Sequence, residues 1–102
     1  MSLTQDKKKR YRSIGHNLNP VVIVSENGLT ANVIDAIEQA LFDHELIKVK
    51  VNVGDREDKK AIIEEIIKQT KCTLVQSIGK MILILKENPK AKEKLSNIKR
   101  PF

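Results

Sequence analysis

The stretch Leu-Ile-Lys-Val-Lys-Val-Asn-Val at residues 46–53 alternates along its length between two kinds of side chain. From Ile47 onward, every second residue is apolar and branched at Cβ. Lys48, Lys50 and Asn52 occupy the positions between them. Because successive side chains of a β-strand point to opposite faces of the sheet, the pattern predicts a strand with one buried face and one wetter face.

Upstream of this strand, the sequence predicts a helix and, before the helix, another strand. Thr30 is placed to cap the helix, and residues 44–45 are placed to end it. Its apolar residues follow the three- and four-residue spacing of a helix face: Val33, Ile34, Ile37, Ala40 and Leu41. The run Val21–Val24 after Pro20 shows no alternation, so we expect a parallel strand in the sheet interior with both faces buried.

Downstream of the same strand, the sequence predicts a helix followed by two strands. Asp55 is placed to cap the helix. The apolar face of this helix comprises Ile62, Ile63, Ile66 and Ile67. Strands are predicted at about residues 73–78 and 81–85, joined by a two-residue hairpin with Gly79 at its first central position.

A basic first helix completes the pattern, with Thr4 placed to cap it and Gly15 to end it. The order is therefore α-β-α-β-α-β-β. A strand–helix–strand unit implies a parallel pair joined by a right-handed crossover, and the final hairpin adds an antiparallel pair. At 102 residues the chain fits one α/β domain, residues 1–87, with a mixed four-stranded sheet packed against helices. We expect the Lys-rich residues 88–102 to form a flexible basic tail.

Positive charge is concentrated at the two ends of the chain. The formal net charge is +6, from 19 Lys and Arg against 13 Asp and Glu. Residues 1–16 hold five Lys or Arg and one Asp, residues 87–102 hold five and two Glu, and the middle is close to neutral. Basic ends favour a polyanionic partner such as nucleic acid, because neutralised phosphates release counterions. Solubility alone would also account for a net charge of this size.

No group of residues points to catalysis or to a metal. His16 and His44 are expected at helix ends, where histidine ordinarily interacts with the helix dipole. Cys72 is the single cysteine, so no internal disulfide can form, and we expect it to pack as a small apolar residue. No P-loop or dinucleotide-binding motif is present. We therefore expect a protein that is not an enzyme, with no catalytic residue, no metal and no cofactor.

Membrane and secretion signals are not evident either. The longest apolar runs, Val21–Val24 and Met81–Leu85, are too short to span a membrane. No charged segment followed by an apolar one begins the sequence, so we expect no signal peptide. With one cysteine, these features favour a reducing, cytoplasmic setting and no membrane partner.

The segment Ser25-Glu26-Asn27-Gly28 joins the predicted strand at 21–24 to the helix that Thr30 caps. Its small and turn-forming residues would let the backbone bend sharply and approach a ligand. Free N–H groups at the following helix N-terminus, together with the positive end of the helix dipole, favour a phosphate. An ordinary strand-to-helix turn would also use such residues.

Aromatic residues are few: Tyr11, Phe42 and Phe102. None of the three falls on a predicted strand. A sheet that stacks nucleobases needs aromatic side chains on its strands, as in RRM and cold-shock proteins. The sequence therefore favours recognition of the backbone and shape of folded RNA.

Several specific segments occur in a fixed order: a basic first helix ending near Gly15-His16, Pro20 before Val21–Val24, Asn27-Gly28-Leu29-Thr30, Glu45-Leu46-Ile47-Lys48-Val49-Lys50-Val51, and Gln76-Ser77-Ile78-Gly79-Lys80. Together, over residues 3–86, they resemble the bacterial YhbY-like, stand-alone CRM domain (chloroplast RNA splicing and ribosome maturation). The resemblance implies a fold similar to the C-terminal domain of a bacterial translation initiation factor and a loop similar to the GxxG loop of KH domains. It also implies RNA binding in ribosome assembly. Ser25 stands where the family loop usually begins with Gly, and Glu26 adds a negative charge.

The leading hypothesis is an RNA-binding protein that binds structured ribosomal RNA and assists assembly of the large ribosomal subunit, acting as a monomer. One continuous phosphate-binding surface would combine helix and loop residues: Lys8, Lys9, Arg12, Ser25, Glu26, Asn27, Gly28 and Thr30. Lys48, Lys50 and Lys80 are further candidates, for which a solvated sheet face or turn is the alternative. Two other functions stay open: a nucleoid-type DNA-binding protein, or a protein-interaction module recruited to an assembly enzyme.

Overall fold

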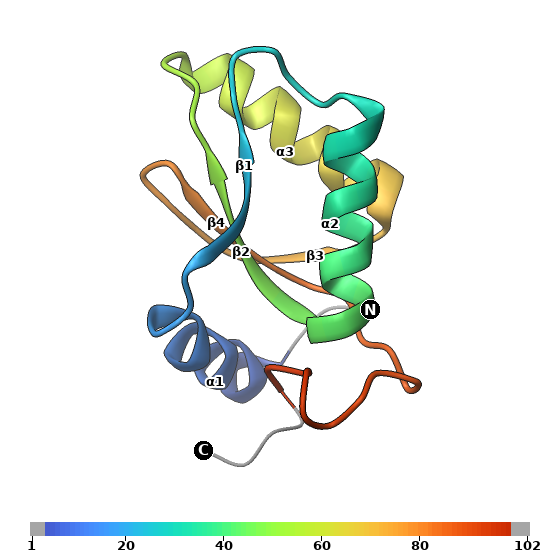
Figure 1. Cartoon of the computed structure of the whole chain (residues 1–102). Coiled ribbons are helices and arrows are strands. Elements are labelled where there is room, and N and C mark those ends of the chain that lie inside the picture. The colour runs from blue at the N-terminus through green and yellow to red at the C-terminus, as the bar shows by residue number, and fades with distance from the viewer. Residues whose placement is uncertain (1–3, 99–102) are drawn as a thin grey trace.

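The computed structural model describes residues 4–98 and has the element order predicted from the sequence (Figure 1). Over these residues the fold is an α/β domain with three helices and a mixed four-stranded sheet, so the predicted fold class is confirmed. The elements are α1 (Gln5–His16), β1 (Pro20–Val24), α2 (Ala31–His44), β2 (Leu46–Val51), α3 (Arg56–Thr70), β3 (Thr73–Ile78) and β4 (Met81–Leu85).

Each helix begins where a polar side chain caps it, as predicted. The hydroxyls of Thr4 and Thr30 each accept a hydrogen bond of 3.2 Å from the backbone N–H three residues further on. The Asp55 carboxylate accepts one of 2.8 Å from the N–H two residues further on. These caps satisfy N–H groups that a helix leaves unpaired in its first turn.

Gly15 lies inside α1 and does not end it, which corrects the sequence-based prediction. The helix continues to His16, and Gly15 rests against the side chain of Leu83. A Cβ atom at this position would lie 2.5 Å from Leu83 Cδ2. The missing side chain therefore allows α1 to approach the sheet closely.

The strands are ordered β1-β2-β4-β3. β1 and β2 are parallel, whereas β4 pairs antiparallel with both β2 and β3. The β1–β2 ladder is irregular between Pro20 and Val22. At the β3–β4 turn Gly79 has a positive φ of 56°, and Ile78 pairs with Met81 across it. The parallel crossover and the two-residue hairpin agree with the sequence-based prediction.

β1 lies at an edge of the sheet and not in its interior, which corrects the expectation for the Val21–Val24 run. Val22 and Val24 pack into the core, whereas Val21 and Ile23 are 51% and 58% exposed. The final hairpin pairs with the far side of β2, so β1 keeps an open edge. An unbroken apolar run has no alternation from which this asymmetry could be predicted.

Helices cover both faces of the sheet (Figure 1), and an apolar core lies on each face. The larger one, under α2 and α3, includes Ile37, Ile47, Val49, Ile66 and Ile84. The smaller one, under α1, comprises Tyr11, Ile14, Leu46, Val75, Leu83 and Leu85. Because α1 covers only one end of its face, the outward side chains of β1 and the end of β3 remain exposed.

Residues 88–98 fold back onto the domain, in contrast to the flexible tail expected from their composition. The Asn97 side chain donates to the Leu46 carbonyl at 2.7 Å, and Ile98 packs against the core under α1. Polar contacts of this kind leave no signal in charge or hydropathy patterns. Residues 99–102 lie outside the described part of the chain, and the domain boundary after residue 87 stays a prediction.

Glu45 anchors this C-terminal segment at the turn between α2 and β2. It has a positive φ of 62° and is 2% exposed. Its carboxylate accepts hydrogen bonds from the Asn88 backbone N–H at 2.7 Å and from the Ser96 hydroxyl at 2.9 Å. A buried carboxylate is costly unless it is hydrogen-bonded. The hydrogen bonds from Asn88 and Ser96 therefore stabilise the buried Glu45, and they also hold the C-terminal segment in place.

We expect Gly15→Ala to destabilise the domain and Ser13→Ala to stabilise it. Ser13 is exposed on the same helix, so its replacement changes mainly helix propensity, by about 0.5 kcal/mol. At Gly15 a propensity gain of about 1 kcal/mol is outweighed by overpacking against buried Leu83, which costs about 1–3 kcal/mol. Urea unfolding measures both changes. A rise in stability for Gly15→Ala would show that α1 can move off the sheet without cost.

Candidate nucleic-acid interface

The loop between β1 and α2 is a tight turn. The Gly28 N–H donates to the Ser25 carbonyl at 2.9 Å, and Gly28 has a positive φ of 80°. Ser25 has no positive φ. The structure therefore uses glycine at the end of this loop, and the serine at its start is accommodated without backbone strain.

Lys80 lies beside this loop, although it is distant in the sequence. A hollow is lined by Ser25, Glu26, Asn27, Asn52, Gly54 and Lys80. The Lys80 ammonium donates to the Asn52 side-chain carbonyl at 3.0 Å. The pairing of β2 with β4 brings Lys80 and Asn52 together. Asn52 and Gly54 line the hollow beside the loop, and neither was among the predicted site residues.

The other side of the loop is acidic. A second hollow there is lined by Glu26, Val53, Gly54, Asp55, Asp58, Ala61 and Ile62. Asp55 and Asp58 come from the start of α3, where carboxylates stabilise the helix. A phosphate at the loop would therefore approach from the side of Lys80.

α1 and the loop do not form one continuous surface, which corrects the sequence-based hypothesis. α1 precedes β1 and the loop follows it, so they lie at opposite ends of that strand (Figure 1). A five-residue strand spans about 16 Å. The sheet face between them must be part of any surface that joins the two.

Lys48 and Lys50 project from this intervening face. Ile47, Val49 and Val51 are buried under α2 and α3, so the lysines between them point to the opposite side. Both lysines are partly exposed. The predicted wetter face of the strand is confirmed, and its two cations lie between α1 and the loop.

The cations of α1 lie on different sides of the helix. Tyr11 faces the sheet, and the Arg10 guanidinium donates at 3.2 Å to a carbonyl of the C-terminal segment. At 100° per residue, Lys8 and Arg12 share the flank of α1 opposite Arg10. Lys9 lies on the side away from Tyr11, exposed to solvent. Lys8 and Arg12 thus form one pair of neighbouring cations on α1.

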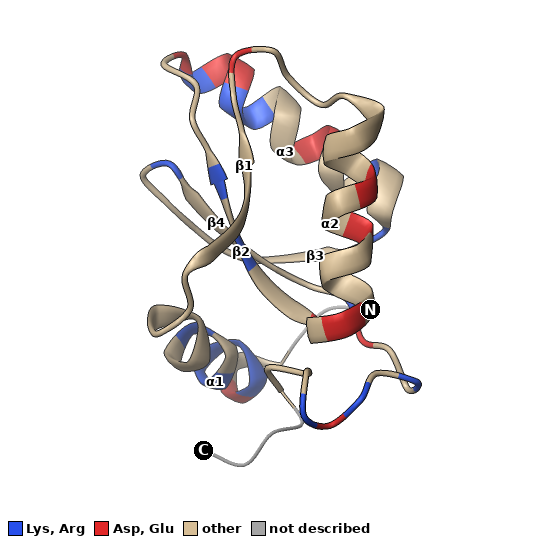
Figure 2. Cartoon of the chain, viewed as in Figure 1, with Lys and Arg blue, Asp and Glu red and all other residues tan. Residues whose placement is uncertain are grey.

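The two faces of the sheet differ in the charge of the helices that cover them. Figure 2 shows blue segments on α1, on β2 and at the β3–β4 turn, red segments on α2, and both colours on α3. α2 and α3 cover the other face of the sheet; α2 contains three Asp or Glu and no Lys or Arg, whereas α3 contains four of each kind. An anion that approaches the α1 side therefore meets mainly positive charge.

The residues considered for metal binding lie apart. Among residues 4–98, no three His, Cys, Asp or Glu side chains form a group that could hold a metal ion. The His44 Nδ1–H donates to the Leu95 carbonyl at 2.6 Å, and Cys72 is buried. None of the described helices has the length and apolar character needed to cross a membrane.

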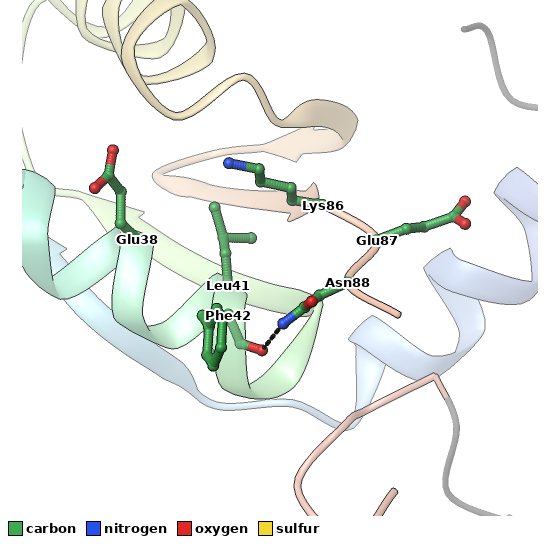
Figure 3. A pocket seen from close by; sticks show the side chains of 6 residues that line it. All are labelled: Glu38, Leu41, Phe42, Lys86, Glu87 and Asn88. Atoms are coloured by element: carbon green, nitrogen blue, oxygen red, sulfur yellow. Dashed lines mark hydrogen bonds between the residues drawn. The ribbon is translucent and has the colours of Figure 1, made fainter. Parts of the chain in front are cut away.

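A separate hollow lies between α2 and the residues that follow β4 (Figure 3). It is lined by Glu38, Leu41, Phe42, Lys86, Glu87 and Asn88. The Asn88 side-chain amide donates to the Phe42 carbonyl at 2.8 Å, which ties the C-terminal segment to the helix. With two carboxylates and one ammonium, this hollow is unsuited to a phosphate.

Comparisons with known proteins extend across these elements. The family model described as the CRS1 / YhbY (CRM) domain matches residues 3–86. A probable RNA-binding protein of Pseudomonas aeruginosa is 54% identical over 100 residues, covering 98% of this chain and 96% of that protein. An RNA-binding protein of Haemophilus influenzae is 44% identical over 94 residues, covering 92% and 95%. The solution structure of a Staphylococcus aureus protein has a TM-score of 0.76 at 38% identity, covering 90% of this chain and 96% of that one.

We expect Cys72 to be a poor nucleophile. Its side chain is 5% exposed, and burial raises the pKa of the thiol, so little thiolate forms near neutral pH. Because the unfolded chain loses this proton at lower pH than the folded chain, stability should fall as pH rises through the ordinary thiol range. Iodoacetamide should label the native protein much more slowly than the protein in urea. Equal rates would mean that the core around Cys72 opens readily.

Proposed function

The chain belongs to the CRS1/YhbY (CRM) domain family, and from this premise we propose that it is an RNA-binding protein and not an enzyme. The observation that carries the proposal is the position of Lys48 and Lys50. They stand on the open sheet face between basic α1 and the loop with Lys80. Phosphates along one RNA could therefore contact all three regions, and neutralising them would release counterions.

The proposed ligand is structured ribosomal RNA, bound as the protein assists assembly of the large subunit in the cytoplasm, as a monomer. Support comes from the sequence resemblance and from relatives named as RNA-binding proteins. The geometry is also favourable, because α1 and the loop are separated by about 16 Å of strand. A folded RNA presents phosphates at such fixed separations, whereas a free chain must be ordered first.

We expect the double variant Lys8→Gln with Arg12→Gln to bind RNA with a weaker salt dependence. Each lost phosphate contact should reduce the slope of log affinity against log salt by about one unit, and hence by about two units in all. The matched control is Lys60→Gln with Lys68→Gln, which removes two exposed charges from α3 on the other face. Equal slopes for the two double variants would place the RNA footprint elsewhere.

The role in assembly has its own test. We expect the protein in a cell lysate to co-sediment with large-subunit particles in a sucrose gradient, and to leave them after ribonuclease treatment. Co-sedimentation that survives ribonuclease would instead indicate recruitment by a protein. Because duplex DNA carries similar phosphates, competition between folded ribosomal RNA and DNA at matched salt separates an RNA-binding from a DNA-binding protein.

A further inference from the structure

One row of side chains crosses the open sheet face from edge to edge. Ile23, Lys50, Met81 and Ile78 are consecutive partners across β1, β2, β4 and β3. They share the face opposite α2 and α3, because the neighbours of Lys50 along β2 are buried under those helices. With strands about 4.8 Å apart, the row is about 14 Å long.

The row is apolar and exposed at both ends. Ile23 is 58% exposed and Ile78 is 63% exposed, and Val21, two residues before Ile23 on β1, is 51% exposed. These are three of the five large apolar residues that are exposed in the described part of the chain. Exposed apolar side chains gathered on one surface are typical of a binding site.

The same face carries positive charge and no negative charge. Within the four strands, Lys48 and Lys50 are the only charged residues. A ligand that suits this face must carry a flat apolar surface and a negative charge, with a few ångströms between the two. Unpaired nucleotides have this combination, because each exposes the faces of its base beside an anionic phosphate. In a duplex the base faces are stacked on one another, so they could not cover the row.

We propose that the open sheet face binds unpaired nucleotides of an RNA, with bases over Ile23, Met81 and Ile78 and phosphates near Lys48 and Lys50. The proposal rests on the proposed RNA-binding function and adds the class of RNA. Aliphatic side chains give apolar contact without aromatic stacking, so binding should tolerate different base sequences. The preferred ligand is then a folded RNA in which an unpaired segment adjoins a helix.

The test compares an unstructured 12-nucleotide RNA with a 12-base-pair RNA duplex, by fluorescence anisotropy at matched salt. The variant is Ile23→Thr with Ile78→Thr, which keeps β-branched residues on the strands and changes no charge. We expect about five- to tenfold weaker binding of the unpaired RNA, an unchanged salt slope and unchanged duplex binding. The control is Phe42→Thr, which alters an apolar side chain that is 53% exposed on α2. It should bind both RNAs as the wild type does.

Each outcome has a separate meaning, provided that thermal unfolding shows both variants to be folded. If the double variant binds unpaired RNA like the wild type, the sheet-face proposal is wrong and RNA binding itself stands. If Phe42→Thr weakens binding equally, the effect is not specific to the row and the proposal is also overturned. If the wild type binds neither RNA, the proposed function fails.

Discussion

The alternation of side chains along β2 is the constraint on which the rest of the structure depends. Ile47, Val49 and Val51 are covered by α2 and α3, and their burial supplies much of the core. Lys48 and Lys50 are thereby directed to the opposite face. A register shift of one residue would bury both lysines and expose the branched residues, so the pairing of the sheet is strongly determined.

Because of this constraint, the proposed RNA-binding surface depends on the sheet more than on the loop. Lysines on a paired strand have fixed backbone positions, whereas the loop at the far end of β1 lies between Lys80 and a group of carboxylates. Glu26, Asp55 and Asp58 lower the attraction of that corner for a phosphate. Lys48, Lys50 and the basic residues of α1 therefore offer a phosphate a more favourable environment than the loop does.

Structural features that depend on a few neighbouring residues were predictable from the sequence. Features that depend on the order of strands in the sheet were not. The caps at Thr30 and Asp55 and the alternation in β2 each lie within a few residues, so the elements and fold class followed from them. The edge position of β1 depends on where the distant hairpin pairs. That pairing also decides which candidate residues meet. It brings Lys80 to Asn52. The separation of α1 from the loop follows instead from the chain order, because one precedes β1 and the other follows it. The contacts of residues 88–98 are hydrogen bonds to backbone and buried groups, for which composition contains no signal.

The irregular start of β1 has a consequence for the molecule in concentrated solution. An edge strand offers unpaired backbone groups on which a strand from another copy could add, and an apolar outward face would strengthen such growth. β1 begins with Pro20, which has no N–H to donate, and its ladder with β2 is irregular up to Val22. The missing donor makes the start of this edge a poorer template for a second strand. Addition of another strand at this edge is thus disfavoured where β1 begins, next to the exposed Val21.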